Sequence, residues 1–217
     1  MTNWAVFDID GTLLPGASLE RLFLSKLLRE GILTSRQVVY FALEWVKLAP
    51  HAGCINALKQ NKAFFRNLPV DRVIAVGKSF FTESIQPRFS EKGLKQVQDC
   101  REAGYHIMLM SGAPFFLVEN LVKVIHPDYV VAARLNVQAG RFTGKLQQPH
   151  PYGMEKKRYL LNLQDALTID FSNSAVFANH FSDIHHMELF GRVVAVNPGW
   201  RLRRYALKQG WKVEFWR

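Results

Sequence analysis

The feature of this sequence that restricts the fold most is an alternation that runs from residue 90 to the end of the chain. Short apolar runs are separated by longer stretches whose apolar residues recur three or four positions apart; these runs are 105–110, 174–179 and 192–197. Such runs are typical of buried strands, and the three-to-four spacing is typical of amphipathic helices. Residues 128–146 read as one more strand, which runs into a hairpin at Ala139 and Gly140. Strands that alternate with helices predict an α/β fold with a mainly parallel sheet and helices on both faces.

The beginning of the chain departs from this alternation. Residues 4–9 form a short apolar run that predicts a buried first strand. About four helices without any strand signal come next, and the second of them is expected to end before Pro50; their ranges are 19–31, 36–49, 55–68 and 70–85. We therefore expect a core domain made of residues 1–16 and 87–217, interrupted by a helical cap domain of residues 17–86.

Charge and composition restrict the partners. The formal net charge of the 217 residues is +10, which favours anionic partners such as phosphorylated metabolites. No zinc-finger spacing, arginine-glycine tract or ribonucleoprotein motif is present, so we expect no nucleic-acid partner, and the basic tail 200–212 keeps nucleic-acid binding as a weaker alternative. The longest apolar run, 38–46, is too short to cross a membrane, so no transmembrane segment is expected. Two cysteines and no signal-peptide pattern favour the cytoplasm.

Polar residues follow three of the predicted strands. Asp8 and Asp10 come at the end of the first strand, Ser111 and Gly112 follow the strand 105–110, and Asn179 ends the strand 174–179. Side chains alternate along an extended strand, so the two aspartates point to the same side. Ligands of open α/β sheets bind beyond the carboxyl ends of the strands. We therefore expect these side chains to meet in one site.

The ordered set of motifs resembles a known family. "DIDGT" at 8–12, "MSGAP" at 110–114, Lys156 and "ANHFSD" at 178–183 are similar to the motifs of the haloacid dehalogenase superfamily of phosphohydrolases. The helical insert after the first motif resembles the branch that contains phosphoserine phosphatase. The resemblance implies a three-layer α/β sandwich of the Rossmann type, with a helical cap inserted after the first strand.

The resemblance also implies a reaction and the residues that perform it. It implies a phosphomonoester phosphatase that acts through an aspartyl-phosphate on Asp8, with Asp10 as general acid and then general base. The implied phosphate-binding residues are Thr12, Ser111, Gly112 and Lys156, and Lys156 fits the family spacing better than Lys157 does. The implied cofactor is Mg²⁺, and its implied ligands are Asp8, the main-chain carbonyl of Asp10, Asn179 and Asp183.

The last motif departs from the family pattern. Ala178 and Asn179 stand where the family usually has glycine and a metal-binding aspartate, so one negative charge is lost. Asn179 can still bind Mg²⁺ more weakly, or Asp183 can bind it directly or through water. A third reading is a catalytically impaired binding or regulatory protein with the same fold. His180 lies next to Asn179, and we expect it to face the site.

The substrate is less well indicated. In phosphoserine phosphatases the insert carries a glutamate and an arginine for the substrate; Glu20 lies near the first position, and Asn61, beside Lys62, occupies the second. The clamp for phosphoserine is therefore not intact, and we do not predict that substrate. The insert is rich in aromatic residues, most of which are expected to pack between helices. The remaining reading is an apolar substrate pocket, so we expect a small phosphorylated metabolite or a lipid phosphate.

Overall fold

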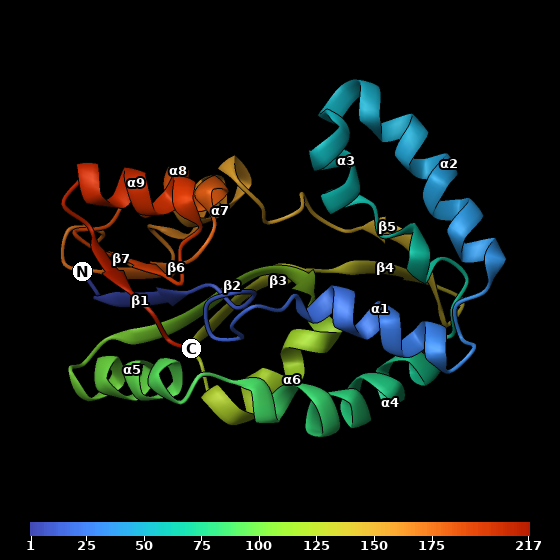
Figure 1. Cartoon of the computed structure of the whole chain (residues 1–217), viewed down its shortest axis with the longest axis horizontal. Helices are drawn as coiled ribbons and strands as arrows, with labels where there is room; N and C mark the ends of the chain where they lie inside the picture. The colour runs from blue at the N-terminus through green and yellow to red at the C-terminus, as the bar shows by residue number, and fades with distance from the viewer.

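The computed structural model describes residues 1–217, apart from the side chain of Ala52. Six strands form one sheet in the order β3-β2-β1-β6-β7-β8, and every neighbouring pair is parallel (Figure 1). The strands are β1 (Trp4–Phe7), β2 (His106–Pro114), β3 (Tyr129–Ala133), β6 (Ala175–Ala178), β7 (Arg192–Val196) and β8 (Lys212–Glu214). Because β1 lies between β2 and β6, the residues that follow β1 emerge beside the ends of both neighbours.

Helices cover both faces of this sheet, so the predicted three-layer α/β fold is confirmed (Figure 1). One face carries α5 (Glu91–Glu102) and α6 (Phe115–Ile125), and the other carries α7 (Met154–Leu163), α8 (Ile184–Met187) and α9 (Trp200–Lys208). Side chains of β1 alternate between two apolar clusters: Ala5 and Phe7 join one, and Trp4 and Val6 join the other. This alternation follows from the two-residue period of a strand and explains why β1 is apolar throughout.

The insert after β1 is helical. It comprises α1 (Leu19–Arg29), α2 (Ser35–Ala52), α3 (Cys54–Gln60), the 3₁₀ turn η1 (Ala63–Phe65) and α4 (Val70–Phe80), which continues as η2 (Phe81–Ile85) and η3 (Gln86–Arg88). Throughout the described part of the chain, no helix combines the length and the apolar character needed to cross a membrane. The division into a core of 1–16 and 87–217 and a cap of 17–86 stays a prediction.

Two predicted helix boundaries in the insert are wrong. Helix α2 continues through Pro50, because a proline in the last turn removes only one backbone donor, and it stops at Gly53, which adopts φ +76°. The predicted helix 55–68 is divided into α3 and η1. The side chain of Asn61 accepts a hydrogen bond from the backbone N–H of Ala63 at 3.0 Å, and this local bond replaces the helical pattern.

The predicted hairpin is confirmed as β4 (Leu135–Gln138) and β5 (Arg141–Leu146), which pair antiparallel. Its turn residues Ala139 and Gly140 both have positive φ, as a two-residue hairpin requires. The hairpin also contacts the insert: the backbone N–H of Asn67 donates to Phe142 O at 2.8 Å, and Phe142 N–H donates to Leu68 O at 3.0 Å. Hydrogen bonds therefore attach the hairpin to the insert, although the two segments are far apart in the sequence.

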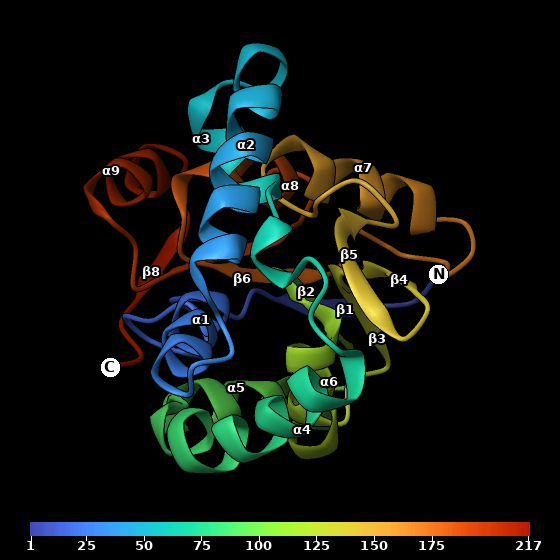
Figure 2. The same ribbon diagram turned by 90° about the vertical axis from the view of Figure 1, so that its right-hand side faces the viewer.

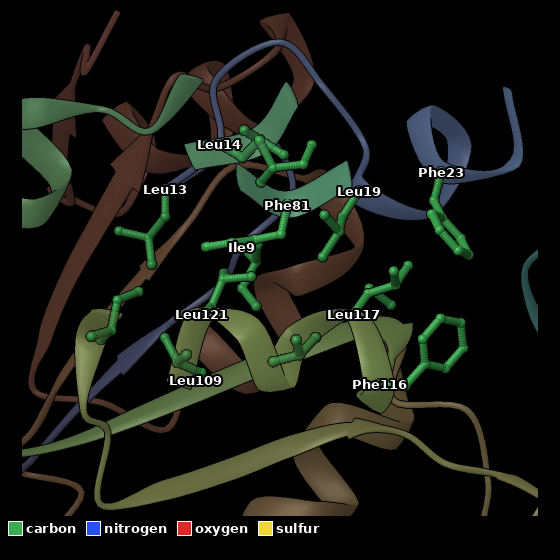
Figure 3. Close-up of a cluster of buried hydrophobic side chains, with 14 of the residues drawn as sticks. Ile9, Leu13, Leu14, Leu19, Phe23, Phe81, Leu109, Phe116, Leu117 and Leu121 are labelled. Carbon is green, nitrogen blue, oxygen red and sulfur yellow. The ribbon is translucent and has the colours of Figure 1, made fainter. Parts of the chain in front are cut away.

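An apolar cluster supports the segment that leaves β1. Figure 3 shows Ile9, Leu13 and Leu14 of this segment above the α6 residues Leu117 and Leu121, with α1 beside them. Every one of these side chains is buried. Packing therefore holds the residues on either side of Asp10 against the core.

Candidate active site

The carboxyl ends of β1, β2 and β6 and the insert surround a cavity of about 640 Å³. Asp8 and Asp10 reach it from the segment after β1, Ser111 reaches it from β2, and Asn179 from the segment after β6. The insert also lines the cavity, with Glu20 of α1 among its side chains. The structure thus brings polar residues from separate parts of the chain to one place.

Asp8 is held by the turn that follows it. Its backbone N–H donates to Phe177 O of β6 at 2.9 Å, which continues the sheet pairing. The hydroxyl of Thr12 donates to Asp8 Oδ2 at 3.2 Å. The turn that brings Thr12 back toward Asp8 contains Gly11 at φ +81°, a conformation that glycine adopts without a steric penalty. Thr12, which the sequence assigned to phosphate binding, therefore has Asp8 as its hydrogen-bond partner.

Lys156 lies between two carboxylates. Its Nζ atom is 2.7 Å from Asp8 Oδ1 and 2.9 Å from Asp183 Oδ1, and all three side chains are buried. Lys156 stands in the first turn of α7, which begins after Gly153, so the start of this helix points the ammonium group at the strand ends. The neighbouring Lys157 is partly exposed.

The electrostatics of this trio follow from burial and proximity. Burial raises the pKa of Asp8 to about 7, although the charge of Lys156 acts in the opposite direction. Burial alone would lower the pKa of Lys156, but the carboxylates of Asp183 and Asp8 outweigh it and raise that pKa. The pKa of Asp183 lies below its usual value, because the charge of Lys156 outweighs the effect of burial. Lys156 therefore stays protonated and stabilises two carboxylates that would otherwise repel each other.

Asp10 is placed by the first turn of α1. Its Oδ1 atom accepts a hydrogen bond from the backbone N–H of Leu19 at 2.9 Å. Burial raises the pKa of Asp10 above its ordinary value, and the bond from Leu19 opposes that rise. A carboxyl group with a raised pKa is suited to carry a proton to a leaving group.

Ser111 and Gly112 form another wall of the cavity. Ser111 is buried, and its hydroxyl oxygen accepts a hydrogen bond from the backbone N–H of Ala113 at 3.1 Å. The ring of His150 packs against Gly112: a Cβ on this glycine would lie 2.8 Å from Cε1 and 2.9 Å from Nε2 of His150. The strand β2 extends beyond the predicted end at residue 110 to Pro114, so Ser111 and Gly112 belong to its last residues.

Oxygen donors for a divalent cation gather near Gly11. Asn179 packs against this glycine so closely that a Cβ there would lie 1.9 Å from its Nδ2 atom. Among the side chains that the structure describes, no three from His, Cys, Asp or Glu lie close enough together to form a metal site. A metal here would therefore also need backbone and amide oxygens. Asp8, the carbonyl of Asp10, Asn179 and Asp183 offer only oxygen donors, which fit Mg²⁺.

The residues suggested for substrate binding have partners within the protein. Glu20 lines the insert side of the cavity. It forms an ion pair with Lys62, in which Glu20 Oε2 and Lys62 Nζ are 2.5 Å apart. Asn61 donates to Phe41 O at 2.8 Å and accepts from Ala63, so its amide holds two insert segments together. His180 contributes to the cavity wall, but its Nδ1 atom lies 2.8 Å from Ser182 Oγ.

His150 and Asn197 are among the cavity residues that the sequence analysis did not predict. His150 lies in the segment between the hairpin and α7, and its Nδ1 atom is buried without a hydrogen-bond partner among the described residues. Asn197 follows β7, donates to Gly11 O at 3.0 Å and accepts from the backbone N–H of Trp216 at 2.9 Å. His150 belongs to no recognisable motif. Asn197 ends a predicted strand, and that position was the only available signal.

Comparison with proteins of known sequence identifies relatives along most of the chain. The sequence model of haloacid dehalogenase-like hydrolases matches residues 5–188. A protein of Mycobacterium tuberculosis named phosphoserine phosphatase SerB1 is 23% identical over 222 residues, covering 100% of this chain and 72% of that protein. The inhibition of morphological differentiation protein of Streptomyces azureus is 27% identical over 216 residues, covering 96% of this chain and 76% of that protein.

Solved structures share the fold. A Bordetella pertussis protein of unknown function has a TM-score of 0.83 at 18% identity, with 99% of both chains covered. A phospho-aspartyl intermediate analogue of phosphoserine phosphatase has a TM-score of 0.67 at 19% identity, covering 100% of this chain and 94% of the other. The matched sequence model spans the Asp8, Ser111, Lys156 and Asn179 segments described above, and the chain belongs to the haloacid dehalogenase-like hydrolases.

Proposed function

We propose that this hydrolase is a Mg²⁺-dependent phosphomonoester phosphatase that forms an aspartyl-phosphate on Asp8. The observation that carries the proposal is the buried ammonium group of Lys156 between Asp8 and Asp183 at the cavity beyond the strand ends. Phosphoryl transfer needs positive charge beside the nucleophile and the phosphoryl oxygens. The name of the relative SerB1, a phosphoserine phosphatase, supports the same reaction class.

The residues suggest a two-step transfer. In the first step a carboxylate oxygen of Asp8 forms a bond to phosphorus, the bond from phosphorus to the alcohol oxygen breaks, and Asp10 gives its proton to that oxygen. In the second step Asp10 takes a proton from water, the water oxygen bonds to phosphorus, and the bond to Asp8 breaks. Inorganic phosphate leaves, and both aspartates return to their starting states.

The positions of the surrounding residues support a role for each of them in phosphoryl transfer. Lys156 binds a phosphoryl oxygen and stabilises the Asp8 carboxylate, while Ser111 and the backbone amides after it bind other phosphoryl oxygens. When Mg²⁺ is bound by Asp8, the Asp10 carbonyl, Asn179 and Asp183, it neutralises negative charge on the transferred group. Thr12 orients the Asp8 carboxylate through their hydrogen bond.

The cavity wall indicates the class of substrate. The insert contributes apolar side chains to the cavity, namely Leu24, Phe41, Leu58 and Phe64. Glu20, the insert's carboxylate at this wall, is paired with Lys62, and the amide of Asn61 binds the backbone. These pairings support a small metabolite or a lipid phosphate whose alcohol part is apolar, rather than an amino-acid phosphate. We further propose that residues 17–86 act as a cap that excludes water during transfer.

Asn179 supports one alternative. An amide attracts a divalent cation less than a carboxylate does, so a binding or regulatory protein with an impaired metal site is the second candidate. One experiment separates the two: hydrolysis of p-nitrophenyl phosphate with MgCl₂ by the wild type, Asp8→Asn and the surface control Asp71→Asn. We expect turnover by the wild type and by Asp71→Asn, and only background by Asp8→Asn. Equal rates in the wild type and Asp8→Asn would favour the alternative.

A further inference from the structure

Helix α2 has a broad apolar surface, of which only part is covered. Its inner face packs against the rest of the insert, where the rings of Phe41 and Phe64 stack with centroids 4.0 Å apart. Its outward side nevertheless exposes large apolar side chains; Val38, Val39, Leu43 and Val46 are 53–62% exposed. Large apolar side chains that gather on one exposed side of a helix indicate that something covers that side.

The neighbouring helix α3, which packs against α2, also exposes apolar side chains. Ile55 of α3 is 69% exposed, and Leu58 is 48% exposed. Figure 1 shows α2 and α3 apart from the sheet and from α5 to α9, and in Figure 2 their upper ends project beyond the rest of the chain. We call the exposed apolar side chains Val38, Val39, Leu43, Val46 and Ile55 the outer face. On α2, the exposed residues Val39, Leu43 and Val46 follow the spacing of one helix side.

The charges around the outer face are nearly all positive. Residues 31–70 contain a single acidic residue, Glu44, and five lysines and arginines. Arg36 and Lys47 are exposed on α2 next to the outer face. Arg66 is exposed after η1 and lies over the ring of Tyr40 of α2, whereas Lys59 of α3 faces the cavity. An apolar stripe bordered by arginine and lysine is the pattern of helices that lie in the interface of an anionic membrane.

We propose that the outer face of α2 and α3 binds the surface of an anionic lipid bilayer, with α2 lying in the plane of the interface. The charge distribution selects this occupant. A second copy of the chain would bring equally basic surfaces together, whereas anionic headgroups complement them. The inference does not rest on the proposed phosphatase activity. Leu58, Phe41 and Phe64 connect this region to the cavity, so a lipid phosphate held at the membrane would meet the site directly.

The test uses the intact protein and two double variants with the same change in charge. Leu43→Glu/Val46→Glu places two carboxylates on the outer face. Leu161→Glu/Leu207→Glu is the matched control, because these side chains are 45% and 64% exposed on α7 and α9. Binding is measured by co-sedimentation with vesicles of phosphatidylcholine alone and of phosphatidylcholine with 30% phosphatidylglycerol. Thermal melting shows that each variant is folded, and p-nitrophenyl phosphate hydrolysis is recorded without vesicles.

We expect the wild type and the control to sediment with the anionic vesicles and to remain in solution with neutral ones. The outer-face variant should bind the anionic vesicles at least tenfold more weakly while its hydrolysis rate stays unchanged. The proposal would be overturned if the wild type did not bind anionic vesicles, or if both double variants bound them equally weakly. Light scattering supplies a further outcome: a wild-type dimer that the outer-face variant dissociates would assign the face to a second copy and also overturn it. Absence of hydrolysis by the wild type would count against the proposed function. The membrane proposal would still be decided by the vesicle measurements alone.

Discussion

The side chain of Asn179 must fit against Gly11 and also lie beside Asp8. Its amide packs against Gly11, where a Cβ would leave no room, and it lies at the strand end beside Asp8. An amide side chain at this position therefore depends on a glycine in another segment. The aspartate that the family usually has here would occupy a similar volume and add a negative charge.

Replacing Asn179 by aspartate should strengthen Mg²⁺ binding. A hard divalent cation prefers a carboxylate to an amide oxygen, because the attraction of opposite charges is large at short range. We expect Asn179→Asp to lower the Mg²⁺ concentration that gives half-maximal activity by about tenfold, equivalent to about 1.4 kcal/mol. The measurement is a Mg²⁺ titration of activity, with Asn162→Asp as a control of equal charge. A curve that superimposes on the wild type would show that position 179 does not touch the metal.

His150 should make stability depend on pH. Its side chain is only 5% exposed, and burial, with the charges of Lys62 and Lys59, lowers its pKa to about 2. The unfolded chain protonates this histidine near pH 6.5, whereas the folded chain does not. The folded state therefore has its full stability above pH 6.5 and loses it as the pH falls from 6.5 toward 2.

The variant His150→Phe isolates this contribution. Phenylalanine keeps the ring beside Gly112 and removes the titrating group. Between pH 7 and pH 5 the wild type should lose up to about 2 kcal/mol more unfolding free energy than the variant, at about 1.4 kcal/mol per pH unit below 6.5. Urea unfolding at both pH values measures the two losses. Equal losses would show that His150 is already protonated in the folded protein or titrates alike in both states.

Among the elements, α1, η1, α6 and β5 meet through phenylalanine rings. Phe65 of η1 is fully buried, and its ring centroid lies 6.4 Å from Phe23, 5.6 Å from Phe116 and 6.1 Å from Phe142. These rings come from the insert, from a helix of the sheet domain and from the hairpin. One apolar cluster therefore attaches the insert to the rest of the chain.

Truncating Phe65 should weaken that attachment. Phe65→Ala removes a buried ring and leaves a cavity among three others, so the free energy of unfolding should fall by about 3–5 kcal/mol. Phe215→Ala is the control, because Phe215 is half exposed and its loss should change stability by less than about 1 kcal/mol. Denaturant unfolding measures both. A small effect of Phe65→Ala would mean that the insert moves in to fill the space.

The sheet domain and the insert share the cavity, and one contact spans it. Lys59 of α3 lies over the ring of Tyr152 in the segment before α7, with Nζ 5.4 Å from the centroid. A ligand in the cavity would touch both parts of the chain and Lys156 between them. Binding of a ligand should therefore stabilise both parts of the chain together against unfolding.

Inorganic phosphate with MgCl₂ should raise the melting temperature of the wild type. A ligand at a hundred times its dissociation constant stabilises the folded state by about 2.7 kcal/mol, if it does not bind the unfolded chain. The variant Lys156→Met lacks the buried ammonium group and should show little or no shift, whereas Lys157→Met should behave as the wild type. Thermal melting with and without the ligands is the measurement. Equal shifts in all three proteins would place the phosphate elsewhere.

Much of the fold could be predicted from the residues in order, because its determinants are local. The helix that begins after Ser90, the hairpin turn at Ala139 and the apolar strands each depend on a few neighbouring residues. Two helix boundaries in the insert were missed where a single residue departs from its usual preference: Pro50 was tolerated in a last turn, and Asn61 used its side chain to end a helix. Asp8 and Asp10 were visible in the sequence because the motif places both within three residues.

The contacts that make the site specific depended on tertiary structure. Asp183 and Lys156 are on different elements, and only the packing of α7 beside the end of β6 brings them within 2.9 Å. His150 approaches Gly112 for the same reason, and no local pattern marks it. For α2, the spacing of apolar residues predicts a helix but not which part of its broad apolar surface is covered. Side-chain spacing acts over one or two turns, whereas burial depends on every segment that folds against the helix.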